Sequence, residues 1–152
     1  MNKKTIVLAS DHAGYPLKQA LKARLEEAGY PTVDMGTDST ASCDYPVYAE
    51  LGCRRLLEGG GDLLILCCGT GVGMSMAANK IRGIRAACCS DVYSARYTRL
   101  HNDANVLCLG ARVVGEGLAW DLCEAFITTE FEGGKHARRV GLIMDLETKD
   151  RA

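Results

Sequence analysis

The stretch that decides the fold is residues 63–73, which read LLILCCGTGVG. Residues 63–67 are all apolar, and a short apolar run that leads into a turn is typical of a buried β-strand. The glycines at 69, 71 and 73 free the backbone to turn and to approach a ligand. Residues 63–73 therefore predict a strand, a tight turn and the N-terminus of a helix in direct succession.

Outward from this stretch, short aliphatic or β-branched runs alternate with longer amphipathic stretches, as in βα units around a parallel sheet. The predicted strands are residues 5–9, 32–35, 63–67, 84–88 and 105–109. The predicted helices are residues 16–28, 46–58, 73–80, 91–101, 116–128 and about 135–148. The pattern predicts an α/β fold, a three-layer α/β/α sandwich with a Rossmann-like, five-stranded parallel sheet.

Length and composition predict a single domain over residues 1–152. The chain is 47% hydrophobic and 24% charged, which provides enough apolar material for one core. Its net charge is -1 and its basic residues form no block, so we expect no nucleic-acid partner. No apolar segment is long enough to predict a membrane span, and Lys3 and Lys4 lead directly into a strand, so we expect a cytoplasmic protein.

The eight cysteines lie mostly inside apolar runs and form no C-x-x-C pair. This pattern supports neither a zinc ribbon nor a secreted disulfide framework. We expect most of them to be small buried hydrophobic side chains, and we expect no metal site.

The carboxyl edge of the sheet is the expected ligand site, because βα loops and helix N-termini gather there. The amide groups of the glycine-rich turn and the dipole of the following helix form a cradle for negative charge. The turn is not the dinucleotide fingerprint, since Met74 stands where a glycine is required, and no P-loop lysine follows. We therefore expect no cofactor, while Asp91 after the fourth strand leaves a nicotinamide dehydrogenase as an alternative.

One of the two adjacent cysteines should face the glycine-rich turn, because neighbouring side chains of a strand point to opposite faces. Cys68 immediately precedes the first glycine and is the candidate. An ordinary thiol has a pKa of about 8.5, and a helix N-terminus lowers such a pKa by stabilising the thiolate. Cys68 is predicted to be a base, and the alternative is a sulfur that only packs under the turn.

Other polar side chains flank the predicted strands. Asp11 and His12 follow the first strand, where Asp11 could instead cap a helix. His101 lies among polar and small residues, and an imidazole suits proton transfer, although surface histidines are common. Arg112 and the basic residues of 135–139 fit phosphate oxygens, with a solvated helix start as the alternative for the latter.

Motifs along nearly the whole chain resemble the type B ribose-5-phosphate and galactose-6-phosphate isomerases, a group of sugar-phosphate isomerases. Their order along the chain is more specific than any one motif. They are SDHAG at 10–14, DYP at 44–46, CGTGVG at 68–73, AANK at 77–80, GIRA at 83–86, HND at 101–103, GARVVG at 110–115 and EGG at 132–134.

The resemblance implies an aldose–ketose isomerase that moves a proton between C1 and C2 of a sugar phosphate through an enediolate. Ribose 5-phosphate is the expected substrate, with allose 6-phosphate and galactose 6-phosphate as alternatives. It implies that Cys68 is the base, that His101 assists ring opening and that Thr70 handles hydroxyl protons. A rival interpretation is a non-catalytic module that holds a phosphate or nucleotide in the same glycine-rich turn.

The resemblance also implies which residues bind the substrate. Asp11 and Asn102 would contact sugar oxygens, while His12, Arg112 and Arg139 would hold the phosphate, some of them from a neighbouring subunit. The complete expected set is Asp11, His12, Tyr45, Gly69, Gly71, Val72, Gly73, Asn102, Arg112, Lys135 and Arg139.

Lys135 stands where the family often has arginine, so it keeps the charge without the forked donors. The resemblance implies a homodimer with shared sites, with a tetramer as the alternative. The helix predicted at about 135–148 is then expected to pack on the partner subunit.

Overall fold

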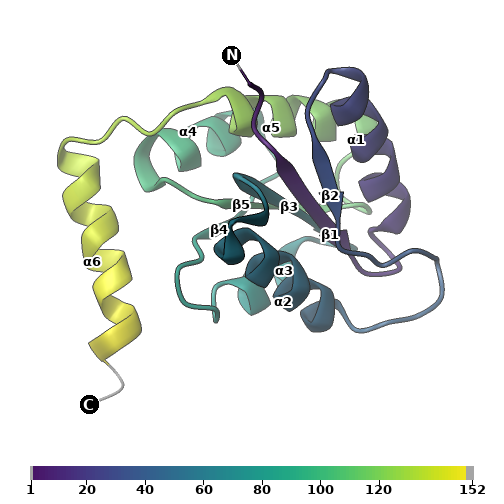
Figure 1. The fold of residues 1–152 in the computed structure, drawn as a ribbon, viewed down its shortest axis with the longest axis horizontal. Helices are drawn as coiled ribbons and strands as arrows, with labels where there is room; N and C mark the ends of the chain where they lie inside the picture. The colour runs from purple at the N-terminus through teal and green to yellow at the C-terminus, as the bar shows by residue number, and fades with distance from the viewer. Residues whose placement is uncertain (1, 150–152) are drawn as a thin grey trace.

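The computed structural model describes residues 2–149, which form one five-stranded parallel sheet covered by helices on both faces (Figure 1). The strands are β1 (Ile6–Ser10), β2 (Thr32–Asp34), β3 (Leu63–Cys68), β4 (Ala86–Cys88) and β5 (Val106–Gly110). They pair in the order β2-β1-β3-β5-β4, and every neighbouring pair is parallel. The predicted three-layer α/β/α fold is confirmed.

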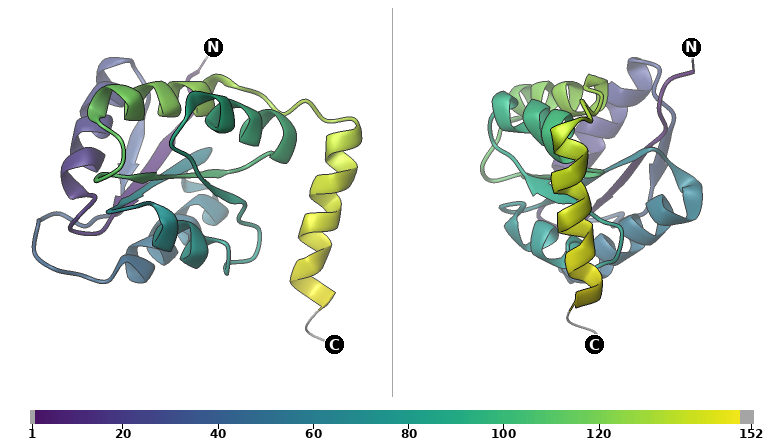
Figure 2. Two further views of the ribbon diagram at one scale, coloured as in Figure 1. Left: turned by 180° about the vertical axis from the view of Figure 1, so that it is seen from behind. Right: turned by 90° about the vertical axis from the view of Figure 1, so that its left-hand side faces the viewer.

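The helices divide into two layers and one outlying helix. Their bounds are α1 (Tyr15–Glu27), α2 (Tyr45–Arg55), the π-helical turn η1 (Leu56–Gly60), α3 (Val72–Ala78), α4 (Val92–Asn102), α5 (Glu116–Thr128) and α6 (Lys135–Lys149). The helices α1, α4 and α5 cover one face of the sheet, and α2 and α3 cover the other. Figure 2 shows α6 at one side of the body, where it contacts α4. Within residues 2–149, no helix has the length and apolar character required to cross a bilayer.

Strand β3 lies in the middle of the sheet, and all of its residues are buried. Its side chains alternate between the two cores, so that Ile65 and Cys67 pack under α1 and α5 while Leu66 and Cys68 pack under α2 and α3. The prediction that Cys67 and Cys68 point to opposite faces is therefore confirmed. Cys68 is the last residue of the strand and is paired in register with Gly110.

Two predicted elements differ from the structure for identifiable reasons. The strand predicted at 84–88 begins only at Ala86, because the N–H of Arg85 bonds to Oδ1 of Asn105 at 2.8 Å instead of to a strand. The helix predicted at 46–58 leaves α-helical geometry after Arg55, where η1 follows, and Gly59 has a φ of 82°. The remaining predicted boundaries differ by a residue or two, as is usual for element ends.

A buried ion pair joins α1 to the end of β2. Lys18 is 1% exposed, and its Nζ lies 2.6 Å from Oδ1 of Asp34 and 2.6 Å from the carbonyl oxygen of Thr37. We expect Asp34→Ala to lower the free energy of unfolding by about 3 kcal/mol, because it leaves a buried ammonium without its counter-charge. Urea unfolding at matched protein concentration measures the loss.

The matched control is Lys22→Ala, because Lys22 is more exposed and lies 3.7 Å from the same carboxylate. Loss of this partly exposed pair is expected to cost about 0.5 kcal/mol. The double variant Lys18→Met/Asp34→Ala should recover much of the stability, because it removes the unpaired charge. Equal losses for Asp34→Ala and Lys22→Ala would contradict the importance of the buried pair.

Candidate functional site

The turn between β3 and α3 requires glycine. Gly71 has a φ of 80°, and a β-carbon there would lie 2.9 Å from Sγ of Cys88 and from the backbone of Leu109. A β-carbon on Gly73 would lie 2.8 Å from the ring of Tyr45. The chain therefore passes close to its neighbours at this turn and places the start of α3 directly beside the end of β3.

The sulfur of Cys68 faces this turn. Cys68 is 4% exposed, and its Sγ accepts a hydrogen bond from the N–H of Gly71 at 3.1 Å. A backbone N–H aimed at a sulfur stabilises negative charge on it. No other cysteine sulfur within residues 2–149 accepts a backbone N–H.

The neighbouring cysteines have different surroundings. Burial and, to a smaller extent, the nearby Cys68 together raise the pKa of Cys67 to about 12. Burial also raises the pKa of Cys88, which is exposed in part and donates its S–H toward the carbonyl oxygen of Thr70 at 3.6 Å. The hydrogen bond from the Gly71 N–H therefore distinguishes Cys68 from the other thiols near the turn.

Several amide groups of the turn are free to bind a ligand. Oγ1 of Thr70 accepts a hydrogen bond from the N–H of Val72 at 3.3 Å. The N–H groups of Gly69, Thr70 and Gly73 donate to no other group within residues 2–149. Such groups beside a base are suited to holding an oxyanion.

Asp11 and His12 lie at the same edge of the sheet, just after β1. Asp11 is 6% exposed, its N–H donates to the carbonyl oxygen of Cys67, and its Oδ1 accepts from the N–H of Gly14 at 2.9 Å. Asp11 therefore closes the turn before α1 and does not cap the helix, whose N-cap is Gly14 without a side-chain hydrogen bond. Its Oδ2 accepts no hydrogen bond within residues 2–149. Nδ1 of His12 accepts from the N–H of Cys43 at 3.2 Å.

Arg112 lies over the glycine-rich turn from the end of β5. Its N–H donates to the carbonyl oxygen of Gly69 at 3.0 Å, and its Nη1 lies 3.2 Å from the position of a β-carbon on Gly69. The predicted residues that the structure gathers at this carboxyl edge are Asp11, His12, Tyr45, Cys68, Gly69, Thr70, Gly71, Val72, Gly73 and Arg112.

The other predicted residues lie at the opposite edge of the sheet. His101 and Asn102 end α4, which runs back along the sheet toward the starts of β4 and β5, where Asn102 accepts a hydrogen bond from Arg85. Lys135 and Arg139 begin α6, beside the same end of α4. The two edges are separated by the length of β5, about 16 Å at about 3.3 Å per residue. One chain therefore does not bring His101 to Cys68.

Glu132 and His136, for which the sequence predicts no role, complete the group around His101. Oε2 of Glu132 lies 3.5 Å from Nε2 of His101 and 4.0 Å from Nε2 of His136. The i, i+4 spacing of Glu132 and His136 is the signal in the sequence that could have paired them. The ligand atoms of these three residues lie within 4.8 Å of one another, but the imidazole planes are only 9° apart. Their lone pairs therefore do not converge on one metal ion.

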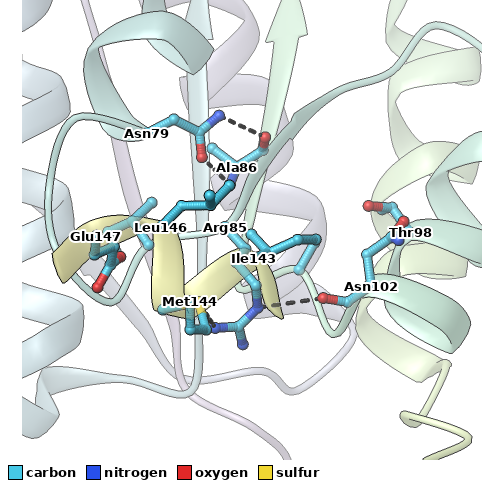
Figure 3. A pocket seen from close by; sticks show the side chains of 11 residues that line it. Asn79, Arg85, Ala86, Thr98, Asn102, Ile143, Met144, Leu146 and Glu147 are labelled. Carbon is cyan, nitrogen blue, oxygen red and sulfur yellow. Dashed lines mark hydrogen bonds between the residues drawn. The ribbon is translucent and has the colours of Figure 1, made fainter. Parts of the chain in front are cut away.

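A cavity of about 530 Å³ lies under α6 at this second edge, and Figure 3 shows its lining. Arg85 Nη1 donates to Sδ of Met144 at 3.3 Å, and the N–H of Gly83 donates to Glu147 at 2.8 Å. The cavity is open between α6 and the body of the protein, and Cys68 does not line it.

Comparisons with known proteins identify the family of this chain. A family model described as Ribose/Galactose Isomerase matches residues 6–143. Ribose-5-phosphate isomerase B of Escherichia coli is 46% identical over 146 residues, which are 96% of this chain and 98% of the relative.

Solved structures show the same fold. Ribose-5-phosphate isomerase B of Clostridium thermocellum matches with a TM-score of 0.94 and 46% identity, over 96% of this chain and 99% of that one. The enzyme of Mycoplasma genitalium, solved with bound ribulose 5-phosphate, matches with a TM-score of 0.90 and 39% identity, over 95% and 97%. The resemblance inferred from the motifs is confirmed, and the chain belongs to the Ribose/Galactose Isomerase family.

Proposed function

We propose that this chain interconverts ribose 5-phosphate and ribulose 5-phosphate. The observation that carries the proposal is the sulfur of Cys68, which accepts the Gly71 N–H at 3.1 Å at the mouth of a turn with free amide groups. A base beside oxyanion donors is the arrangement that proton abstraction next to a carbonyl requires. The names of the relatives and the ribulose 5-phosphate bound to the Mycoplasma genitalium enzyme support the choice of sugar.

The proposed reaction begins with the closed sugar. His101 transfers a proton to the ring oxygen while the C1 hydroxyl gives its proton to a solvent water, which breaks the bond between C1 and the ring oxygen and leaves the aldehyde. The Cys68 thiolate then removes the proton from C2, and the electron pair moves to the carbonyl oxygen to form an enediolate. Cys68 returns the proton to C1, and Thr70 moves the hydroxyl proton between O2 and O1. The product is the ketose, with no net gain or loss of electrons.

The glycine-rich turn supplies the stabilisation of the enediolate. The N–H groups of Gly69, Thr70 and Gly73 are the donors available for its oxygen. One such donor typically lowers the barrier by about 2.7 to 4 kcal/mol, because it is already oriented before charge develops. Asp11 Oδ2 is available to accept a hydrogen bond from a sugar hydroxyl.

A second copy of the chain completes the proposed site. His101, Asn102, Lys135 and Arg139 lie at the opposite edge of the sheet from Cys68, so within one chain they cannot act on the same sugar. In a two-fold dimer each chain can present one edge to the other edge of its partner, which forms two equal shared sites. Phosphate is then held by His12 and Arg112 of one chain and by Lys135 and Arg139 of the other.

The surface of α6 supports contact with a partner subunit. Leu142, Ile143 and Leu146 are 48%, 45% and 59% exposed on this helix. Apolar side chains gathered on one exposed helix indicate a contact with another protein surface. We therefore keep the homodimer, with a tetramer as a higher assembly, as part of the proposal.

The free state of all eight thiols supports a reducing compartment, for which we propose the cytoplasm.

Turnover of a panel of aldose phosphates tests the proposed substrate. We expect kcat/KM for ribose 5-phosphate to exceed the values for allose 6-phosphate and galactose 6-phosphate by at least about tenfold, because a longer sugar displaces the phosphate from its cations. Coupled initial-rate assays on the purified protein measure the three values. A preference for a six-carbon sugar would contradict the choice of ribose 5-phosphate. Binding of all three without turnover would instead favour the non-catalytic module.

A further inference from the structure

A carboxylate and two imidazoles meet where the end of α4 contacts the start of α6. Oε2 of Glu132 lies 3.5 Å from Nε2 of His101 and 4.0 Å from Nε2 of His136. We infer that Glu132 is a positioning residue that, together with His136, holds the His101 imidazole in place for opening the sugar ring. This inference rests on the function proposed above and assigns Glu132 and His136 a part in one of its steps.

A backbone hydrogen bond of Glu132 places this residue beside His101, independently of the Glu132 side chain. The N–H of Glu132 donates to the carbonyl oxygen of Leu100 at 3.0 Å, in the last turn of α4. Arg99, which is 7% exposed, donates to the carbonyl oxygen of Thr129 at 3.4 Å and to Asp103 at 2.8 Å. The segment between α5 and α6 is thus tied to the turn that carries His101.

His101 is confined by two aromatic neighbours. The imidazole of His136 stacks on it, with ring centroids 3.9 Å apart, and the ring of Tyr97 meets it nearly at right angles at 4.9 Å. Gly133 and Gly134 have φ of 72° and 58°, which lets the chain turn sharply so that α6 starts with His136 against His101. These two contacts restrict the rotation of the partly exposed His101 ring.

The surroundings of His136 favour its neutral form. Burial lowers the pKa of His136, the neighbouring His101 lowers it further, and Lys135 and Arg139 act in the same direction, while Glu132 opposes them. A neutral His136 places no positive charge of its own beside the His101 ring on which it stacks. A carboxylate behind a functional imidazole orients it and stabilises its protonated form.

The competing interpretation is that Glu132 only stabilises the start of α6, since acidic groups near a helix N-terminus are favourable. A purely structural role would lower the amount of folded or assembled enzyme and would slow every catalytic step equally. A positioning role would slow ring opening alone. The two interpretations therefore differ in which step of the reaction responds.

The test compares conversion of ribose 5-phosphate, which requires ring opening, with hydrogen exchange at C1 of ribulose 5-phosphate, which does not. Ribulose 5-phosphate cannot close to a furanose, because its C5 oxygen carries the phosphate. For Glu132→Gln we expect kcat/KM on ribose 5-phosphate to fall by about 10- to 100-fold, the loss seen for carboxylates behind metal-bound imidazoles. The same variant should exchange the C1 hydrogen of ribulose 5-phosphate for solvent deuterium at the wild-type rate. Proton NMR measures this wash-in. The kinetic isotope effect on kcat/KM, measured with ribose 5-phosphate deuterated at C2, should fall toward 1, because ring opening then limits the rate.

The matched control is Glu130→Gln, since Glu130 lies in the same segment but pairs with Lys4 at 2.6 Å. This control should keep wild-type turnover, and Glu132→Asp should recover part of the loss. Wild-type turnover of ribose 5-phosphate by Glu132→Gln would overturn the inference. The inference would also fail if turnover and deuterium exchange at C1 of ribulose 5-phosphate fell by the same factor while the isotope effect at C2 stayed at its wild-type value. Turnover of ribose 5-phosphate by the wild-type protein is measured first, so failure of the proposed function is seen separately.

Discussion

Cys68→Ala is expected to lower turnover by about 10³-fold or more, starting from either ribose 5-phosphate or ribulose 5-phosphate, since a positioned base contributes about 10²- to 10⁴-fold. The loss is expected in both directions because the same sulfur removes and returns the proton. The affinity for the sugar phosphate should be retained, since Arg112, His12 and the amide groups of the turn are unchanged. Initial rates measure the turnover, and calorimetric titration of the variant measures binding.

Cys88→Ser is the matched control for this prediction. Cys88 lies against the same turn, where its Sγ contacts the Thr70 carbonyl oxygen, but burial raises its pKa and it receives no backbone N–H. The control should retain wild-type turnover. A Cys68→Ala variant that keeps more than a small fraction of the activity would show that another group is the base.

Mixing two inactive variants is expected to restore activity. Cys68→Ala is defective at the carboxyl edge of the sheet, and His101→Asn is defective at the opposite edge. If each site combines one edge from each subunit, a mixed dimer has one intact site and one doubly defective site. Random reassociation makes half of the dimers mixed, so about one quarter of all sites should be intact. Co-refolding the two variants, followed by a turnover assay, measures the recovered activity.

A second mixture controls for this result. Cys68→Ala and Asp11→Asn are both changes at the carboxyl edge, so every shared site in their mixed dimer carries one defect. That mixture should stay inactive under the same refolding conditions. Recovery in neither mixture would indicate that the edges do not combine across subunits, and recovery in both would point to refolded wild-type contamination.

The fold could be predicted from short-range patterns. The apolar run at 63–67 and the glycines that follow it determine a buried strand and a turn, because period and turn conformation depend on residues close together in the chain. Alternation along the strand predicts that only one of Cys67 and Cys68 faces the turn, and the position of Cys68 directly before Gly69 makes it the candidate. The predicted start of the fourth strand at residue 84 is wrong, because the N–H of Arg85 donates to the side chain of Asn105, which lies far from it in the sequence.

The sequence by itself determined the α/β class, the glycine-rich turn and the sulfur that faces it. Only the tertiary structure decided that β5 lies between β3 and β4, that His101 is at the edge opposite Cys68, and that Glu132 and His136 gather around it. The physical reason is the range of the interactions. Periodicity and turns depend on neighbouring residues, whereas strand order and the docking of α6 depend on contacts between residues far apart in the chain, which no local pattern encodes.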